Sequence, residues 1–299
     1  MVRPTSLPPI RSPLQTPAGA VLVLLAALLV GGCGGAGASD DAAGVSLTVT
    51  RGFGHTEVDA VKLAKLPDGA TALSLLRDES DVGAPGPGWT FFVNGVKPDD
   101  AARDYELSPG DQVQWDQHES KAPVRAIVGS FPDPFRRDLN GERRPVRVEC
   151  DDAESDPCRD AKATLERFGV PASGSSLGAP GTEHVTRLVV ARWPGARIVR
   201  GGFTLEEGPA SNGVFARFSK DGTSLDLLDA SGAVARTVHP GDGTALIVAL
   251  RPRADELLWL ITALDARGLA AGVRALSEDA LRGAFAVAVT GRAVEKLPL

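Results

Sequence analysis

Residues 88–116, which read "GWTFFVNGVKPDDAARDYELSPGDQVQWD", decide how the first half of this chain folds. They hold five of its fifteen aromatic residues, although aromatic residues make up only 5% of the sequence. Side chains alternate in "WTFFV" and "QVQW" with the period of two that is typical of a half-buried strand. The Asn-Gly and Pro-Gly-Asp sequences between these segments are strong turn signals. We therefore predict two strands, 89–93 and 112–115, separated by turns.

The residues before this stretch add two more strands and a helix. Val45, Leu47 and Val49 alternate with polar residues in "GVSLTVTRGFG", and a second strand is predicted over 58–63. An aspartate and helical spacing of the leucines in "DGATALSLLRDES" predict a short helix. The order strand, strand, helix, strand, strand favours an α+β sheet with one packed helix.

The aromatic-aromatic-Val-Asn-Gly sequence, followed by Asp-Tyr-x-Leu-x-x-Gly-Asp-x-Val-x-Trp, resembles the transcobalamin C-terminal-like domain. This β-grasp-type module occurs in bacterial surface proteins and in vertebrate cobalamin carriers. The resemblance covers Val45 to about Glu119, and its matching residues are Trp89, Phe91, Phe92, Val93, Asn94, Gly95, Asp104, Tyr105, Leu107, Gly110, Asp111, Val113 and Trp115. It implies a β-grasp-like N-terminal domain, residues 45–120, and a role in enclosing a small, corrinoid-like molecule. One departure is the segment "SDVGAPGPG" (80–88), which is shorter than in the family, so that a pocket shaped by it would be lost.

The aromatic residues of this stretch divide between two faces of a strand. Phe91 shares one face with Trp89, and we expect Phe91 and Trp115 to fill the core under the helix, while Phe92 points the other way. Exposed beside Tyr105, Phe92 would form an apolar platform of the kind that marks binding surfaces. The candidate ligand-binding residues are therefore Phe92, Asn94, Tyr105 and Trp115.

Residues 121–299 predict a second, α/β domain, because strand and helix patterns alternate along them. Continuous or alternating apolar runs predict strands within 122–135, 143–150, 184–193, 244–252, 257–263 and 283–291, and a hairpin or meander over 213–238. Helices are predicted over 156–170 and 266–276, and a loop over 171–183. No family resemblance is found in this half.

The first 32 residues have the pattern of a lipoprotein signal peptide. Arg3 and Arg11 precede an apolar run, Ala18–Val30, which at ~1.5 Å per residue is shorter than the ~30 Å hydrocarbon core of a bilayer. The following "LLVGGCGG" resembles a lipobox that would leave Cys33 as a lipidated N-terminus, with residues 33–44 as a flexible tether. We expect a protein anchored by this lipid to the extracytoplasmic face of the cell membrane; a short retained anchor or a plain secreted chain is the alternative.

Charge and cysteine content narrow the functions. Without Arg3 and Arg11 the chain keeps 30 basic and 38 acidic residues, a net charge near −8 that argues against nucleic acid as a partner. Cys150 and Cys158, eight residues apart in an exported chain, predict a disulfide. The histidines lie far from both cysteines in sequence, so we expect no metal site there.

The sequence contains weak catalytic signals. Residues 174–178, "GSSLG", fit the Gly-x-Ser-x-Gly nucleophile elbow, but the flanking residues read as loop. The acidic residues of "ECDDAESDPC" (149–158) favour a solvated loop over a calcium site. No motif indicates a cofactor. We expect a non-enzymatic, lipid-anchored binding protein for a small ligand; the alternatives are a structural or interaction protein that contacts envelope proteins and, less favoured, an exported hydrolase.

Overall fold

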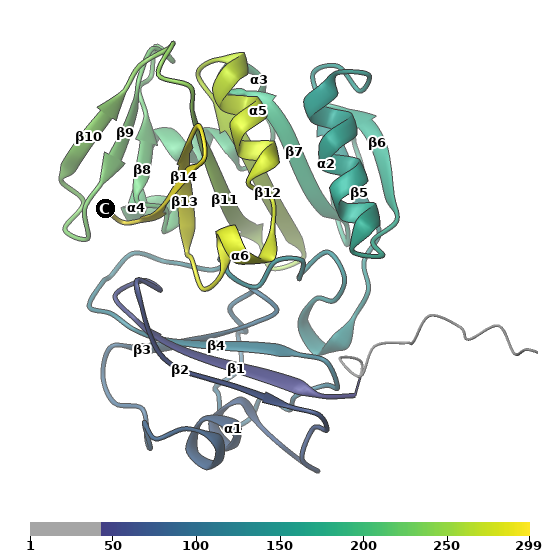
Figure 1. Cartoon of the computed structure of the whole chain (residues 1–299), viewed down its shortest axis with the longest axis vertical. Coiled ribbons are helices and arrows are strands. Elements are labelled where there is room, and N and C mark those ends of the chain that lie inside the picture. The colour runs from purple at the N-terminus through teal and green to yellow at the C-terminus, as the bar shows by residue number, and fades with distance from the viewer. Residues whose placement is uncertain (1–42) are drawn as a thin grey trace, which may run out of the picture. The chain divides into compact units, whose positions relative to one another are not determined.

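A computed structural model describes residues 43–299 (Figure 1). The chain is mixed α/β, with most of its regular structure in three sheets. The signal peptide, Cys33 and most of the tether lie outside the described residues. Within residues 43–299 no helix is long and apolar enough to cross a membrane.

The N-terminal sheet has four strands in the order β2-β1-β4-β3. Its strands are β1 (Val45–Arg51), β2 (Thr56–Leu63), β3 (Trp89–Val93) and β4 (Gln112–Gln117), and its helix is α1 (Ala72–Glu79). The central pair β1–β4 is parallel, and the outer pairs β1–β2 and β3–β4 are antiparallel. The helix begins at a capping box, in which Thr71 and Ser74 exchange side-chain to backbone hydrogen bonds. The order of elements predicted from the sequence is confirmed.

The two faces of this sheet bury different residues, because side chains alternate along each strand. One face packs beneath α1 and includes Phe91, Val93 and Trp115, so the prediction that Phe91 and Trp115 belong to the core is confirmed. The opposite face carries Phe92 and Gln114. Phe92 packs against residues of the second half of the chain, and Gln114 donates to the Gly283 carbonyl at 2.9 Å.

The second half contains a seven-stranded mixed sheet in the order β14-β13-β11-β12-β7-β5-β6. Its strands are β5 (Val146–Cys150), β6 (Ala172–Ser176), β7 (Thr186–Arg192), β11 (Thr244–Arg253), β12 (Glu256–Ala263), β13 (Ala286–Thr290) and β14 (Ala293–Leu297). Strands β12, β7, β5 and β6 are parallel to one another, and β11, β13 and β14 extend the sheet with antiparallel pairs. The apolar runs that predicted these central strands are those of a sheet buried on both faces.

Each face of the large sheet has its own cover. Helices α2 (Asp156–Arg167) and α5 (Ala266–Arg274) lie side by side over one face (Figure 1). The other face packs against α3 (Trp193–Ile198), a 3₁₀ turn η3 (Gly202–Glu206) and a three-stranded antiparallel sheet of β8 (Ala216–Phe218), β9 (Leu225–Leu228) and β10 (Val234–Val238). The remaining short helices are η2 (Leu139–Gly141), α4 (Pro209–Asn212) and α6 (Glu278–Leu281). The predicted meander over 213–238 is confirmed.

A disulfide and a buried ion pair link β5 to its neighbours. The predicted disulfide Cys150–Cys158 is present and joins the end of β5 to the first turn of α2. Arg187 of β7 and Glu149 of β5 form a buried two-pronged ion pair, with N–O distances of 2.7 and 2.8 Å. Such paired geometry is what allows both charges to remain inside a sheet.

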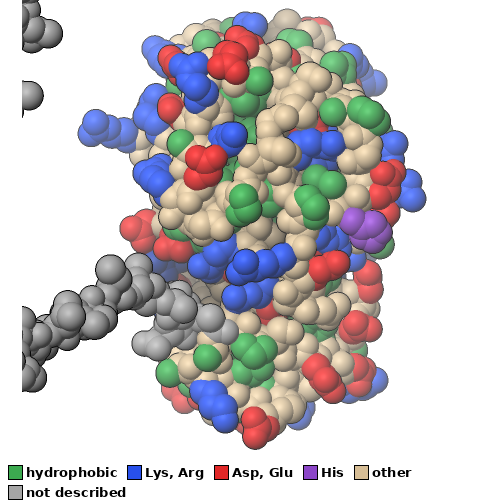
Figure 2. Space-filling model, turned by 90° about the vertical axis from the view of Figure 1, so that its right-hand side faces the viewer, with side chains coloured by type: hydrophobic (Ala, Val, Ile, Leu, Met, Phe, Trp, Pro, Cys, Tyr) green, Lys and Arg blue, Asp and Glu red, His purple; other side chains and the backbone are tan. Residues whose placement is uncertain are grey.

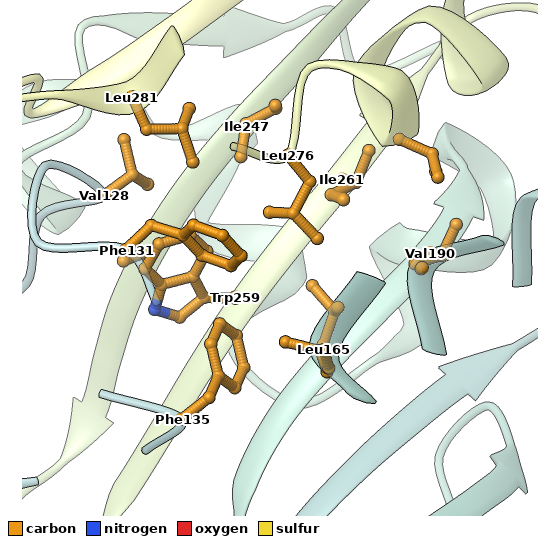
Figure 3. Close-up of a cluster of buried hydrophobic side chains, with 14 of the residues drawn as sticks. Val128, Phe131, Phe135, Leu165, Val190, Ile247, Trp259, Ile261, Leu276 and Leu281 are labelled. Carbon is orange, nitrogen blue, oxygen red and sulfur yellow. The ribbon is translucent and has the colours of Figure 1, made fainter. Parts of the chain in front are cut away.

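Two predicted segments differ from the structure. Residues 122–135 were predicted as a strand but form an irregular segment with a single bridge, at Ala126. Its prolines have no backbone N–H to donate to a neighbouring strand. Its apolar side chains instead pack into the cores on both faces of the large sheet. In Figure 3, Phe131 and Phe135 lie against Trp259 of β12, at ring distances of 6.0 and 5.0 Å.

Residues 171–183 were predicted as a loop, but Ala172–Ser176 forms β6, parallel to β5 at the edge of the large sheet. Its small and polar residues show no apolar alternation because an edge strand with exposed side chains buries little. The pairing therefore leaves no pattern in the sequence.

Candidate ligand pocket at His118

A pocket of about 570 Å³ opens where the N-terminal sheet meets the C-terminal strands. We call it the His118 pocket. Its wall is formed by the β1–β2 turn, the residues before β3 and after β4, and the C-terminal residues of the chain. The lining residues are Gly52, Phe53, His55, Pro87, Gly88, Gln117, His118, Glu119, Ala230, Pro298 and Leu299. Its volume lies within the range of small-molecule sites.

The β1–β2 turn has an unusual backbone. Gly52, Phe53 and Gly54 all have positive φ angles, of 63°, 61° and 81°. Glycine adopts this conformation without cost, whereas Phe53 is a bulky residue in the left-handed region. Any side chain at position 54 is also excluded sterically, since a Cβ there would lie 1.8 Å from the Gly283 carbonyl oxygen. The turn thus aims two consecutive backbone N–H groups at one point beneath it.

That point is the carboxylate of Asp116, which is fully buried. It accepts hydrogen bonds from Phe53 N (3.0 Å), Gly54 N (2.8 Å), the Thr50 hydroxyl (2.6 Å) and His118 Nδ1 (2.6 Å). Burial disfavours the charged form, but the hydrogen bonds from His118, Thr50 and Gly54 outweigh burial and lower the pKa of Asp116 below its ordinary value. Asp116 is therefore an ionised group inside the protein.

Asp116 determines which nitrogen of His118 carries the proton. A carboxylate can only accept, so Nδ1 of His118 must donate, and in the neutral ring Nε2 is then a free acceptor. No residue between 43 and 299 hydrogen-bonds to this Nε2. The ring is stacked on Phe53, with centroids 4.1 Å apart, and contacts the edge of Phe285. The histidine is thus fixed in position; its side chain is 8% exposed, lines the pocket, and has one ring nitrogen without a partner in the described chain.

The rest of the pocket combines apolar and polar groups. Phe53 and two prolines give apolar surface, and Gln117 and Glu119 bring an amide and a carboxylate. His55 is tied to the C-terminal segment by a 2.8 Å hydrogen bond between its Nε2 and the Pro298 carbonyl. Among the described residues that line the pocket there is no serine, threonine or cysteine.

The residues predicted to bind a ligand lie elsewhere and are buried. Phe92 has no exposed surface and packs edge-on against Phe285, at 5.3 Å between ring centroids. Trp115 is stacked on Phe91, and its indole N–H donates to the Ala72 carbonyl. The expectation of an exposed platform at Phe92 is wrong, because the second face of the N-terminal sheet is covered by the second half of the chain.

Tyr105 is also buried, on the α1 side of the sheet, and its hydroxyl accepts a 2.8 Å hydrogen bond from the backbone N–H of Asn140. Burial raises its pKa to about 12. Phe92 and Tyr105 therefore belong to separate cores and do not form one surface.

Asn94 connects the two turns of the stretch 88–116. Its side-chain nitrogen donates to Asp111 (2.8 Å) and to the Asp138 carbonyl (2.9 Å), and its oxygen accepts from Gln112 N (2.9 Å). Asp111 in turn accepts from Ser108 N at 2.8 Å. The Asn-Gly and Gly-Asp pairs of the sequence thus fix the register of β3 and β4 from inside the protein.

The structure forms no catalytic or metal site at the other sequence motifs among the described residues. Ser176 ends β6 and is followed by a turn, so the strand-to-helix geometry of a nucleophile elbow is absent there. Asp152, in the acidic loop, caps the backbone N–H of Glu154. Among residues 43–299 no group of three His, Cys, Asp or Glu side chains is placed to hold a metal ion.

Sequence reasoning missed Asp116 and His118. A usable signal was present: Gln114, Asp116 and His118 follow Phe92 on one face of the sheet, and polar side chains on a face that also carries a buried phenylalanine need internal partners. The sequence does not reveal that backbone N–H groups of the Gly52-Phe53-Gly54 turn bind a carboxylate of the chain itself, that of Asp116.

Comparison with protein-family models matches residues 73–119 to a domain of unknown function, DUF4430. The matched segment begins in α1 and includes both Asp116 and His118. No curated protein and no solved structure matches the chain.

Proposed function

We propose that this protein is a lipid-anchored extracytoplasmic binding protein that holds a small organic ligand in the His118 pocket. In this proposal the N-terminal sheet and α1 are a β-grasp-like module of the transcobalamin C-terminal type. The strand order, the packed helix and the family match over residues 73–119 support the module. Anchoring through Cys33 follows from the lipobox-like sequence.

The observation that carries the proposal is the open Nε2 of His118 on a ring fixed by Asp116. A group held in one geometry binds a ligand at a lower entropic cost than a mobile one. The backbone of His118 is also fixed, because its N–H donates a 3.0 Å hydrogen bond to the Gly88 carbonyl. His118 is therefore held by its backbone, by the Nδ1 hydrogen bond to Asp116 and by stacking on Phe53, which suits it to bind a ligand in one geometry.

The chemistry of the pocket defines the ligand class. In the tautomer with its proton on Nδ1, His118 can accept a hydrogen bond at Nε2, so a ligand of that form would offer a hydroxyl, amide or ring N–H group there. Phe53 and the prolines would cover an apolar or flat part of the same molecule. A corrinoid, which the resemblance implies, would be larger than such a pocket encloses and would be held by an edge. Residues 87 and 88 of the shortened segment line this pocket, so that segment contributes to it.

The binding test compares two histidine variants. His118→Phe keeps an aromatic ring on Phe53 but has no nitrogen; the control, His239→Phe, changes an exposed histidine outside the pocket. Calorimetric titration with a panel of corrinoids, heterocyclic amides and sugars should find a ligand that binds the wild type and the control. The His118→Phe variant should bind it at least tenfold more weakly, the effect of losing one good hydrogen bond.

Equal affinity of His118→Phe and the wild type for every ligand found would refute this site. If no small molecule binds while envelope proteins still associate with His118→Phe, the structural alternative is favoured. The anchor is tested separately with Cys33→Ala, which should abolish incorporation of radiolabelled fatty acid; persistent labelling would refute it.

A further inference from the structure

A second cavity, of about 470 Å³, lies on the C-terminal half of the chain, apart from the His118 pocket. We call it the arginine pocket. Three segments line it: residues 123–125, the stretch from the end of α3 to α4, and residues 250–253 at the end of β11. Its lining includes four arginines and an exposed phenylalanine: Arg125, Arg200, Arg251, Arg253 and Phe203. The two cavities share no residue.

Three of its four arginines have partners within the protein. Arg251 is fixed, since it binds the Lys97 carbonyl (2.8 Å) and Asp99 (3.1 Å), and only 9% of its side chain is exposed. Arg200 binds Glu256 at 2.8 Å, and Arg253 lies 3.6 Å from Asp255. More than half of each of these last two side chains remains exposed. Arg253 can therefore turn toward a ligand, whereas Arg200 stays bound to Glu256, whose side chain is only 1% exposed, and adds its charge from that position.

Arg125 differs from the others. Its backbone is fixed, because its carbonyl accepts from Lys97 N at 2.9 Å and both neighbouring side chains are buried. Its guanidinium, however, makes no hydrogen bond or ion pair with any residue of the described chain, and the residue is exposed. The pocket thus holds one guanidinium whose charge has no counterion among the described residues, beside two that are paired with Glu256 and Asp255.

Apolar surface adjoins these charges. Phe203, on η3, is 50% exposed, which is unusual for phenylalanine, and Leu250 and Pro252 form part of the floor. The position of η3 is fixed by Gly201, whose φ is 90° and where a Cβ would lie 2.5 Å from Pro252. Phe203 is therefore held beside the arginines by the backbone.

The face of the molecule drawn in Figure 2 carries charges of both signs. Acidic and basic side chains are interspersed over it, with basic ones grouped near its middle. A mixed surface of this kind does not attract anions as a whole. Recognition of an anion on such a surface therefore needs a local grouping of basic side chains.

We propose that the arginine pocket binds a phosphate ester whose alcohol part is apolar. The forked guanidinium of Arg125 fits the oxygens of a phosphate, and Arg200 and Arg253 supply further positive charge from the other segments. The alcohol part would pack on Phe203. The same chemistry is present in a free organic phosphate and in a phospholipid headgroup, and a protein anchored close to a bilayer would meet both.

The test uses phenyl phosphate and inorganic phosphate as probes, with affinities measured by calorimetry at low salt. Arg125→Gln should weaken phenyl phosphate binding about tenfold or more. The matched control is Arg292→Gln, an exposed arginine in the β13–β14 turn with no partner among the described residues. Phe203→Ala should weaken binding of phenyl phosphate but not of inorganic phosphate. None of these residues is buried, so the thermal midpoints of the variants should match the wild type.

Vesicles distinguish the two sources of phosphate. Vesicle binding is measured in the Cys33→Ala background, so that no lipid anchor contributes. Binding of Cys33→Ala, but not of the Cys33→Ala/Arg125→Gln double variant, to phosphatidylglycerol vesicles, with none to phosphatidylcholine alone, would identify a lipid headgroup as the ligand. Phenyl phosphate binding without vesicle binding would identify a free ester. The proposal is overturned if neither probe binds, or if Arg125→Gln and Arg292→Gln behave alike. His118→Phe should leave all these results unchanged, so the test is independent of the proposed function.

Discussion

Replacing Asp116 by asparagine tests the buried carboxylate on which the pocket depends. In the structure Oδ1 accepts from Phe53 N and His118 Nδ1, and Oδ2 accepts from Thr50 Oγ1 and Gly54 N. An amide keeps only one of these acceptors. The Thr50 hydroxyl can rotate and His118 can change tautomer, but whichever oxygen becomes an NH₂ group, one backbone N–H loses its partner.

The magnitude follows from that count. A buried donor without a partner costs about 1–3 kcal/mol, and loss of the charge weakens the remaining hydrogen bonds by about 1 kcal/mol more. We therefore expect Asp116→Asn to lower the free energy of unfolding by about 2–4 kcal/mol at neutral pH. Urea denaturation followed by circular dichroism measures it. The control, Asp104→Asn, removes an exposed carboxylate paired with Arg103 and should cost less than about 0.5 kcal/mol.

The pH dependence gives a second, signed expectation. The pKa of Asp116 is lowered in the folded protein, so its stabilisation is complete above the ordinary carboxyl pKa of 3.8 and is lost as the pH falls toward the folded value. The difference in stability between wild type and Asp116→Asn should therefore be constant at neutral pH and shrink below about pH 4. A difference below about 0.5 kcal/mol, or one that persists undiminished in acid, would refute an ionised and hydrogen-bonded Asp116.

Three further predictions concern the cores. Phe92→Ala should cost about 3–5 kcal/mol in urea denaturation, as expected for a buried phenylalanine, whereas an exposed platform residue would cost less than about 0.5 kcal/mol. Tyr105 is the only tyrosine, so the near-ultraviolet absorbance of tyrosinate reports it alone; burial raises its pKa to about 12, and an ionisation midpoint near 10 would contradict its burial. Its raised pKa also means that stability falls as the pH rises through the interval from 10 to 12. Replacing Cys150 and Cys158 together by serine should cost about 2.5 kcal/mol, the entropy of a loop that joins residues eight apart, and reductant should lower the stability of the wild type but not of this variant.

The sequence allowed much of the fold to be predicted where local patterns and burial agree. The alternation around Trp89–Val93 and Gln112–Trp115 and the Asn-Gly turn predicted the N-terminal sheet, and the apolar run in residues 244–252 predicted a central strand of the large one. The apolar pattern did not predict β6, an edge strand with little to bury. It wrongly predicted a strand in residues 122–135, whose apolar side chains enter the cores without forming a strand.

Local sequence patterns could not predict the candidate site, because its residues lie far apart in sequence. Asp116 and His118 are two residues apart, but the N–H groups that stabilise the carboxylate come from residues 53 and 54 and the edge contact comes from Phe285. The burial of Phe92 has the same cause. Alternation shows that it points away from α1, and only the packing of the second half of the chain shows that its face is covered.

The central claim is that Asp116 holds His118 with its Nε2 open to a ligand. Long-range ¹H–¹⁵N spectra of the four histidines test it most directly, since they report the protonation of each ring nitrogen. We expect the neutral ring of His118 to carry its proton on Nδ1, and a ligand found in the titration panel to shift its Nε2 resonance while those of His184 and His239 stay in place. A proton on Nε2, or a bound ligand that leaves this resonance unchanged, would contradict the claim.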